Sequence, residues 1–229
     1  FFSGLSYVVL DEAHYYRGVF GSHIANLIRR MKRILSHYNA SPQFILTSAT
    51  IANPLDFANR LVGLPFNLVD NDSSPKGKRY FLLYNPPVIN EKLGIRKSVH
   101  SEAQTLAKDI LQKDAQSIFF LKTRKSVEML YKDIRDSYPQ YAKDITSYRS
   151  GYLPAERREI EDAIRNRKAK VTLSTNALEL GIDIGGLDII LILGYPGTIA
   201  ATKQQAGRAG RKGAPSASLL LASTNPQDQ

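Results

Sequence analysis

Two acidic residues follow directly on a short apolar run near the start of the sequence. Asp11 and Glu12 come after Tyr7–Leu10, an uncharged stretch typical of a strand buried in a parallel sheet. Ligands of open α/β sheets bind beyond the carboxyl ends of the strands, where these carboxylates would lie. Asp11 can hold Mg²⁺ directly or through water, and Glu12 can orient and polarise an attacking water. The pair therefore suits phosphoryl transfer; the alternative is that both acids only cap the next helix.

A tripeptide with two hydroxyl groups follows the next apolar run. Ser48 and Thr50 come directly after Gln43–Thr47 and flank Ala49. We expect these hydroxyls at the same sheet edge as the acidic pair, where they could link a nucleotide site to a neighbouring lobe. Because Ser and Thr are common at strand ends, the tripeptide is informative only through its order after the acidic pair.

A glutamine and two arginines recur at helical spacing near the end of the chain. At offsets of 0, 4 and 7 they would share one face of a helix that begins near Ile199; the three residues are Gln204, Arg208 and Arg211. Two arginines projecting together suit a γ-phosphate, where an arginine can contribute about 10³–10⁵ in rate. Gly207 and Gly210 each cost roughly 1 kcal/mol in a helix, which indicates a close approach or a helix end. The alternative is a frayed basic helix.

A third segment with polar residues lies between two apolar runs. Thr175–Asp183 follows Val171–Ser174 and is followed by Gly185 and Gly186. Thr175 is placed to touch a phosphate backbone, and Asp183 could reach a ribose or the arginine pair. The alternative is a glycine-rich crossover between strands.

Alternating strands and helices would position these residues. Five short apolar runs read as buried strands: Tyr7–Leu10, Gln43–Thr47, Ser117–Leu121, Val171–Ser174 and Asp188–Leu193. Helical spacing covers Ser101–Asp114, where Ser101 and Gln104 could form a capping box, and recurs over Val127–Ile134. Pro154 would begin a further helix that runs through Asn166. The alternation predicts an α/β fold with parallel sheets.

Composition bounds the class of protein. The 229 residues carry a net charge of +10, and no cysteine is present, which rules out disulfides and thiolate metal sites. The sequence contains no apolar run near the roughly 20 residues that cross a bilayer, and no signal peptide. The four histidines, His14, His23, His37 and His100, show no metal-ligand spacing.

The charge is concentrated beyond a polar, turn-rich stretch at Asn71–Lys78. Residues 1–75 hold 6 Lys/Arg and 5 Asp/Glu, and residues 76–229 hold 25 and 16, so the net charges are +1 and +9. A basic excess favours a polyanionic partner, although a solvated basic surface is the alternative. We place a domain boundary at about residue 75.

In their order along the chain, these motifs resemble those of the superfamily 2 helicases. Asp-Glu-Ala-His, Ser-Ala-Thr, the segment from Thr175 to Gly185 and Gln-x-x-Gly-Arg-x-x-Arg are similar to motifs II, III, V and VI. Phe119–Glu128 resembles motif IV, and Tyr148–Tyr152 resembles the neighbouring strand-contacting segment. The flanking segments resemble one branch, the bacterial mitomycin-repair helicases and their fungal RecQ-like relatives with a C-terminal zinc-binding domain; they are Tyr16–His23, Asn85–Val88 and Tyr195–Thr198.

The resemblance implies two RecA-like lobes with parallel sheets that clamp ATP and Mg²⁺. Residues 1–75 would be the C-terminal part of lobe one, and residues 76–229 would be lobe two. The implied catalytic residues are Asp11, Glu12, His14, Gln204, Arg208 and Arg211. The implied nucleotide-binding residues are Asp11, Ser48, Thr50, Gly181, Asp183, Arg208 and Arg211, with Asp11 on Mg²⁺. The implied nucleic-acid contacts are Arg17, Thr123, Arg124, Arg149 and Thr175.

The resemblance further implies 3′-to-5′ translocation on single-stranded or tailed duplex DNA, a role in DNA repair and no membrane partner. It places a bacterial member in the cytoplasm with the nucleoid and a eukaryotic one in the nucleus. The alternatives are a non-catalytic nucleic-acid-binding or adaptor module, and an RNA translocase.

Two departures from the family pattern accompany these matches. No segment reads Gly-x-x-x-x-Gly-Lys-[Ser/Thr], because Gly77 and Lys78 are followed by Arg79 and lack the upstream glycine. The cysteines of a zinc domain are also missing. We therefore expect a fragment with an incomplete first lobe, whose own ATPase activity is negligible.

Overall fold

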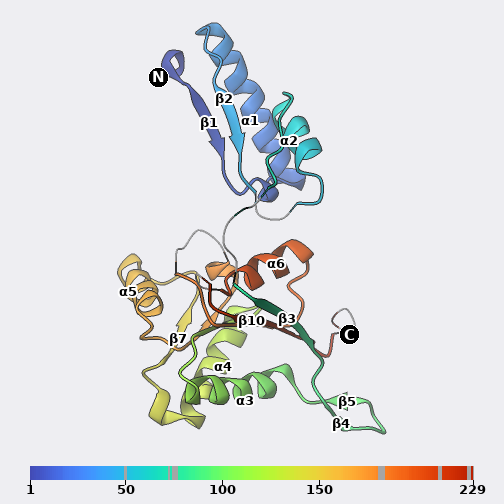
Figure 1. Ribbon diagram of the computed structural model, residues 1–229, viewed down its shortest axis with the longest axis vertical. Helices are drawn as coiled ribbons and strands as arrows, with labels where there is room; N and C mark the ends of the chain where they lie inside the picture. Colours follow the sequence, from blue (N-terminus) through green and yellow to red (C-terminus); the bar gives the residue numbers. More distant parts are fainter. Residues whose placement is uncertain are drawn as a thin grey trace. The chain divides into compact units, whose positions relative to one another are not determined.

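The computed structural model describes residues 1–48, 51–71, 73, 77–179, 184–210, 213–225 and 228. Contacts between residues divide the chain into two compact units, Phe1–Ser73 and Ser74–Gln229 (Figure 1). None of the helices in the described ranges is long and apolar enough to cross a membrane.

Unit 1 is built on two parallel strands and two α-helices. β1 (Tyr7–Leu10) pairs with β2 (Gln43–Leu46) in a register that sets Leu10 opposite Leu46. The remaining elements are η1 (Phe2–Gly4), η2 (Ala13–Tyr15), α1 (Gly18–His37) and α2 (Pro54–Val62). Asp11 and Thr47 are the next residues after the pair of Leu10 and Leu46, so they lie side by side at the carboxyl ends of the two strands.

Only one face of the unit 1 strands is covered. Leu10, Phe44 and Leu46 pack with Ile28 of α1 and Leu61 of α2. The alternate side chains are exposed; they are Tyr7, Val9 and Ile45. The expectation that every apolar run is buried on both faces is therefore wrong for β1 and β2 among the described residues, because both helices pack against the same set of side chains.

Unit 2 contains a six-stranded sheet in which all neighbours run parallel, in the order β3-β10-β9-β6-β8-β7. The strands are β3 (Arg79–Tyr84), β6 (Ser117–Phe120), β7 (Ile145–Tyr148), β8 (Val171–Ser174), β9 (Ile189–Leu193) and β10 (Ser216–Leu221). A short antiparallel hairpin of β4 (Val88–Asn90) and β5 (Ile95–Arg96) follows β3. All four residues of β6 and all four residues of β8 are buried, so both faces of these two strands are covered, as the sequence predicts.

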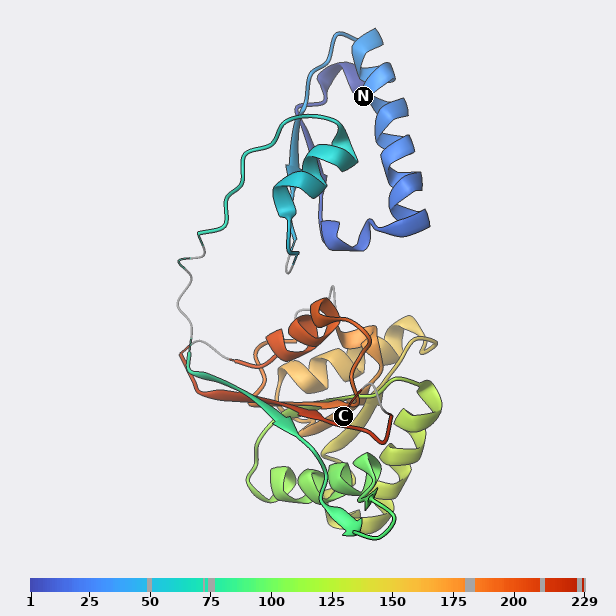
Figure 2. The ribbon, with the colours of Figure 1, turned by 90° about the vertical axis from the view of Figure 1, so that its right-hand side faces the viewer.

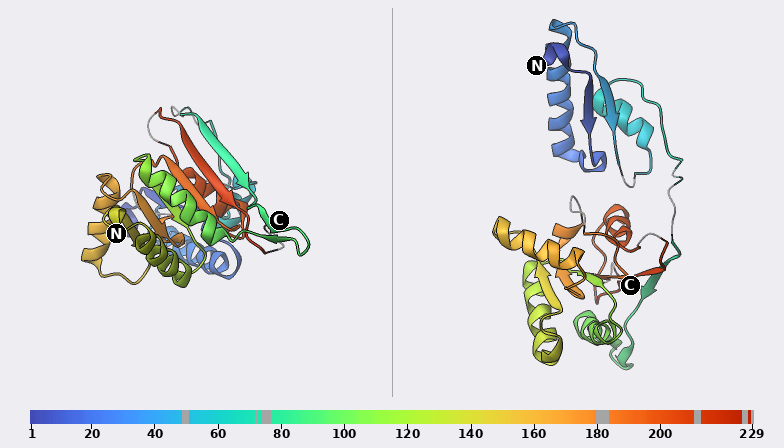
Figure 3. Two further views of the ribbon diagram at one scale, coloured as in Figure 1. Left: turned by 90° about the horizontal axis from the view of Figure 1, so that it is seen from below. Right: turned by 60° about the vertical axis from the view of Figure 1, so that its left-hand side comes forward.

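Helices cover both faces of this sheet (Figures 2 and 3). α3 (Val99–Gln112) and α4 (Arg124–Ser137) pack on one face through a core that includes Phe119 and Leu173. α5 (Pro154–Arg165) and α6 (Ile199–Gly207) lie on the other face, around Ile118 and Ile190. Two short helices complete the unit, η3 (Pro139–Tyr141) and η4 (Asn176–Leu178).

Helix starts follow local capping chemistry. The hydroxyl of Ser98 accepts a hydrogen bond from the backbone N–H of Ser101, so Ser98 is the N-cap of α3 and the predicted capping box at Ser101 is wrong. α5 begins at Pro154, as predicted. Thr198 caps α6 by accepting from the N–H of Ala201 at 3.0 Å.

The end of α6 corrects another prediction. The helix stops at Gly207, Arg208 is its C-cap, and Gly210 has a φ of 111°. Ala209 instead forms a parallel bridge with Leu187. The predicted helix therefore ends at the first of its two glycines, and Gln204 and Arg208 do not lie within one continuous helix; Arg211 lies outside the described residues.

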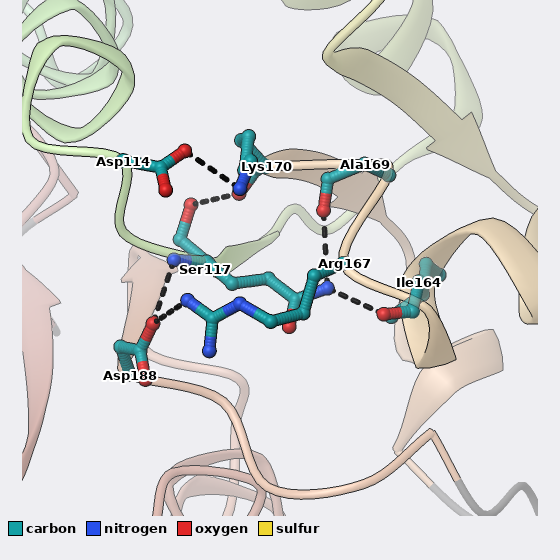
Figure 4. Close-up of polar contacts among 8 residues, drawn as sticks. Asp114, Ser117, Ile164, Arg167, Ala169, Lys170 and Asp188 are labelled. Atoms are coloured by element: carbon teal, nitrogen blue, oxygen red, sulfur yellow. Dashed lines mark hydrogen bonds and ion pairs between the residues drawn. The ribbon is translucent and has the colours of Figure 1, made fainter.

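Hydrogen bonds and ion pairs connect polar residues at the amino ends of the central strands in unit 2 (Figure 4). A carboxylate oxygen of Asp188 accepts from the backbone N–H of Gln116 at 2.9 Å and from the guanidinium of Arg167 at 2.8 Å. The ammonium of Lys170 pairs with Asp114 at 2.6 Å. Gln116, which is completely buried, donates from its side chain to the carbonyls of Ile164 and Ala169. This amino-end network ties the loops before β6, β8 and β9 together.

Candidate nucleotide and nucleic-acid sites

The first cluster of predicted site residues forms at the carboxyl ends of β1 and β2. Asp11 leaves β1 with an exposed side chain, and one of its carboxylate oxygens accepts from the hydroxyl of Thr47 and from the N–H of Glu12. The hydroxyl of Tyr16 donates to the backbone carbonyl of Asp11 at 3.0 Å. The position of Asp11 is thus fixed from the neighbouring strand and from its own loop.

Glu12 and His14 complete this cluster. Glu12 has a φ of 50°, a left-handed conformation that costs energy for a non-glycine residue. Its carboxylate lies 3.4 Å from Nδ1 of the buried His14, and the hydroxyl of Ser48 lies 3.4 Å from the same nitrogen. The structure therefore brings Asp11, Glu12, His14 and Ser48 together within unit 1.

The charge state of Asp11 suits a hard cation. The hydrogen bond from Thr47, followed by that from the N–H of Glu12, lowers the pKa of Asp11 below its ordinary value. The second carboxylate oxygen accepts no hydrogen bond from the described residues. An ionised, exposed carboxylate fits Mg²⁺, which proteins commonly hold through one or two carboxylates plus substrate phosphates. Within the described ranges, no group of three or more His, Cys, Asp or Glu side chains forms a metal site.

Arg17 lies beyond this cluster, at the start of α1. It is the N-cap residue of the helix and its side chain is exposed. The backbone at Gly21 lies very close to Tyr16. A Cβ atom added to Gly21 would stand 2.2 Å from the carbonyl oxygen of Tyr16. A side chain at position 21 is therefore excluded unless the backbone moves.

In unit 2, Arg208 lies against the loop that follows η4. Its guanidinium donates to the backbone carbonyl of Glu179 from Nε at 3.1 Å and from Nη2 at 2.7 Å. The buried carboxylate of Glu179 also accepts from the side chain of Gln205 at 3.0 Å. Gln204, one position earlier on α6, is half-buried. Glu179 therefore joins the end of α6 to the loop after β8 through both its side chain and its backbone.

Thr175 is buried, with 8% of its surface exposed. Its hydroxyl accepts from the N–H of Ala177 at 3.4 Å and so caps η4. In this conformation the Thr175 hydroxyl therefore accepts a hydrogen bond within its own loop, whereas the sequence analysis predicts that it contacts a backbone phosphate.

Three predicted nucleic-acid contacts lie close to the carboxyl ends of β6 and β7. Thr123 caps α4, and Arg124 donates to the hydroxyl of Ser150 at 2.5 Å. The guanidinium of Arg149 pairs with Glu128 at 2.6 Å and lies over the ring of Tyr152 at 4.8 Å. Arg124 is thus held by Ser150 of the segment after β7, and Arg149 is held by Glu128 of α4 and by Tyr152.

Four predicted site residues lie outside the described residues; they are Thr50, Gly181, Asp183 and Arg211.

Sequence reasoning missed several partners that fix these side chains. Thr47 bonds to Asp11, Glu128 and Tyr152 hold Arg149, and Glu179 pairs with Gln205. Thr47 had a usable signal, since a hydroxyl residue at the end of the second strand falls beside an acid at the end of the first. Glu128 and Glu179 are 21 and 26 residues away from the groups they bind, so no local pattern marks these two partners.

Two protein families match successive parts of the chain. Residues 1–57 match the DEAD/DEAH box helicases, and residues 102–213 match the helicase conserved C-terminal domain. The uncharacterized ATP-dependent helicase YprA of Bacillus subtilis is 48% identical over 100% of this chain and 31% of its own length. The ATP-dependent helicase hrq1 of Schizosaccharomyces pombe is 40% identical over 100% of this chain and 22% of its own length.

Solved structures of helicases are also similar to this chain. A crystal structure of the DUF1998 helicase MrfA bound to DNA matches 100% of this chain and 31% of that chain, at 48% identity and a TM-score of 0.94. A second, of MrfA bound to DNA and AMPPNP, matches 100% of this chain and 32% of that chain, at 47% identity and a TM-score of 0.93. The chain thus spans about a third of YprA and of MrfA. With both family matches in this order and the motif residues at the carboxyl ends of its strands, the chain belongs to the DEAD/DEAH-box helicases of superfamily 2, with a RecA-like α/β fold.

Proposed function

We propose that this chain is the motor region of an ATP-dependent DNA helicase that moves 3′ to 5′ along a strand and acts in DNA repair. The observation that carries the proposal is the cluster of Asp11, Glu12, His14 and Ser48 at the carboxyl ends of β1 and β2. Of the two carboxylates at that edge, one can hold Mg²⁺ and the other can orient an attacking water, which suits phosphoryl transfer to water. The relatives named ATP-dependent helicases, and MrfA bound to AMPPNP, support ATP as the nucleotide.

Each residue has a distinct task in this proposal. Asp11 would hold Mg²⁺, which neutralises phosphate charge when bound. Glu12 orients the attacking water and accepts its proton, and His14 holds the Glu12 carboxylate in place. Arg208 would stabilise charge that develops on the γ-phosphate, and Arg211 is proposed to share this role. Gln204 is proposed to act in catalysis with these arginines. Ser48, Thr50, Gly181 and Asp183 are proposed to bind the nucleotide.

We propose that the nucleic acid is DNA, because both MrfA structures contain it. Arg124 and Arg149, which lie at the carboxyl ends of β6 and β7, would contact backbone phosphates, with Thr123, Thr175 and Arg17 as further contacts. Phosphate contacts give grip without reading the base sequence, as a translocating motor needs. Glu128 and Tyr152 would hold Arg149 in a fixed direction, so that less side-chain freedom is lost on binding.

The test replaces Glu12 with alanine in the full-length protein. We expect DNA-stimulated ATP hydrolysis to fall at least about 10³-fold, while a fluorescent ATP analogue binds normally, because the water-orienting carboxylate is lost and the phosphate contacts are not. Glu91→Ala, on the exposed hairpin, serves as the matched control. Normal turnover by the Glu12 variant would refute the assignment.

Strand displacement on tailed DNA and RNA duplexes then identifies the nucleic acid. Unwinding of the DNA duplex from a 3′ tail is the expected outcome, and preference for RNA would instead support an RNA translocase. ATP-independent binding without unwinding by the full-length protein would support a non-catalytic module.

A further inference from the structure

α1 carries a concentrated positive charge that the proposed motor does not use. Four of the six Lys/Arg residues of unit 1 lie within five positions of this helix; they are Arg29, Arg30, Lys32 and Arg33. α1 is labelled in Figure 1. It runs for 20 residues and contains no Asp or Glu. Its net charge is therefore +4, against +1 for residues 1–75 as a whole.

One of these cations has a structural task. Lys32 is half-buried, and its ammonium donates to the carbonyls of Val62 and Gly63 at 3.2 and 3.3 Å, at the end of α2. It thereby satisfies carbonyl groups that a helix terminus leaves without intrahelical partners. The need to join α1 to α2 accounts for Lys32.

The three arginines are different. Arg29, Arg30 and Arg33 are exposed, and none of them pairs with a carboxylate in the part of the chain that the structure describes. Among the described residues, Arg29 donates to the side-chain oxygen of Asn26 alone, at 3.0 Å. Stabilisation of the helix dipole does not explain them, because that effect is confined to the last turn, whose only basic residue is His37.

The three side chains share one polar face of α1. Arg29 and Arg33 are one turn apart, about 6 Å along the helix axis. With Asn26, Lys32 and Ser36 they line a shallow hollow of about 650 Å³. No aromatic side chain lines this hollow, so it offers no platform on which an unpaired base could stack. What it offers is a row of guanidinium groups, which match phosphate oxygens in geometry and charge.

We infer that this arginine face of α1, formed by Arg29, Arg30 and Arg33, binds the phosphate backbone of duplex nucleic acid. A duplex hides its bases and presents about one charge per 1.7 Å of axis, so a row of arginines without a stacking surface fits it. The inference rests on the proposed function, to which it adds a duplex contact apart from the phosphate contacts of unit 2.

The experiment measures the binding of a blunt, fluorescein-labelled DNA duplex to the whole chain by anisotropy across a range of salt concentrations. The slope of log K against log salt falls by about 0.9 for each phosphate contact that is lost. We expect the triple variant R29A/R30A/R33A to lose about two to three units of slope. Replacing the same three residues by lysine retains the charge, and we expect it to retain most of the slope.

The matched control removes an equal charge elsewhere. Lys108, Lys113 and Lys132 are exposed on or beside α3 and α4, and the variant K108A/K113A/K132A should keep the wild-type slope.

Equal losses of slope in both alanine variants would overturn the inference, because they would show that diffuse charge accounts for the binding. So would an unchanged duplex slope combined with loss of polyglutamate binding, which would assign the face to an acidic protein. A wild-type chain that binds no nucleic acid at any salt concentration would count against the proposed function itself.

Discussion

The two ends of the parallel strands differ in how their polar groups are used. At the amino ends in unit 2, Gln116, Arg167 and Asp188 bond to one another and to backbone, and Gln116 is completely buried. At the carboxyl ends, the exposed carboxylate of Asp11 accepts hydrogen bonds from Thr47 and Glu12, and the exposed guanidinium of Arg124 donates to Ser150. The amino-end groups are thus committed to the fold, whereas the carboxyl-end groups are positioned and still accessible to a ligand. Substitutions at the two ends should therefore change different measured quantities.

The largest effect is expected from matched arginine substitutions at the two ends. Arg208→Lys keeps the charge but loses the planar fork, so we expect ATP turnover by the full-length protein to fall about 10³-fold. Arg167→Lys weakens only the bond to Asp188 and should leave turnover within about twofold while lowering the thermal midpoint slightly. Steady-state ATPase assays and thermal unfolding of both variants check this. Similar turnover in the two variants would remove the distinction.

The second effect concerns stability at the amino ends. Gln116→Leu removes two side-chain hydrogen bonds to the carbonyls of Ile164 and Ala169 in a buried site. We expect a loss of about 1–3 kcal/mol in the free energy of unfolding, with unchanged DNA affinity of the folded protein. The control is Gln112→Leu at the exposed end of α3, for which a change within about 0.5 kcal/mol is expected. Urea titrations measure both, and equal stabilities would contradict the proposed role of the network.

The sequence predicted those parts of the fold that depend on short-range composition. The runs that form β1, β2, β6, β8 and β9 are continuous and apolar, so their strands were identified to within one residue. Three strands of the six-stranded sheet gave no such signal. β7 (Ile145–Tyr148) contains Thr and Ser, β10 (Ser216–Leu221) begins with Ser-Ala-Ser, and β3 (Arg79–Tyr84) is an edge strand with mostly exposed side chains.

The candidate site was predictable only in part, for a related reason. The acids after β1 could be found because strand ends are local features, and their position beside Ser48 followed from adjacent parallel strands. The contact between Thr47 and Asp11 depends on register, and the pairing of Glu179 with Gln205 depends on how α6 lies over the loop after β8. Neither is encoded within one segment of sequence.

A third, smaller effect on ATP turnover is expected from the buried pair of Glu179 and Gln205, which lies at the carboxyl ends of the strands. Gln205→Glu sets a second carboxylate against Glu179 at a separation of about 3.0 Å, which should disturb the position of Arg208. We expect turnover to fall about tenfold, equivalent to about 1.4 kcal/mol in the barrier. The double variant E179Q/Q205E restores one donor and one acceptor and should recover most of the activity. Failure of the double variant to recover would show that the pair does not position Arg208.

The smallest effect concerns two aspartates whose pKa values are lowered by different means. A hydroxyl and a backbone N–H lower the pKa of Asp11, whereas the ammonium of Lys170 lowers that of Asp114. Both folded pKa values lie below the unfolded value of about 3.9, so each interaction stabilises the fold above that pH. That contribution is lost as the pH falls through the folded pKa.

Salt should separate the two aspartates. At 1 M salt the screening length is about 3 Å, so the pKa of Asp114 should rise toward its ordinary value while that of Asp11 stays nearly constant. Thr47→Val should raise the pKa of Asp11 alone, and Lys170→Met that of Asp114 alone. Carboxyl-carbon NMR titrations at low and high salt measure all of these shifts. Equal salt sensitivity would mean that Asp11 is also held by a cation, and that the carboxyl end is less open to a metal ion than its hydrogen bonds indicate.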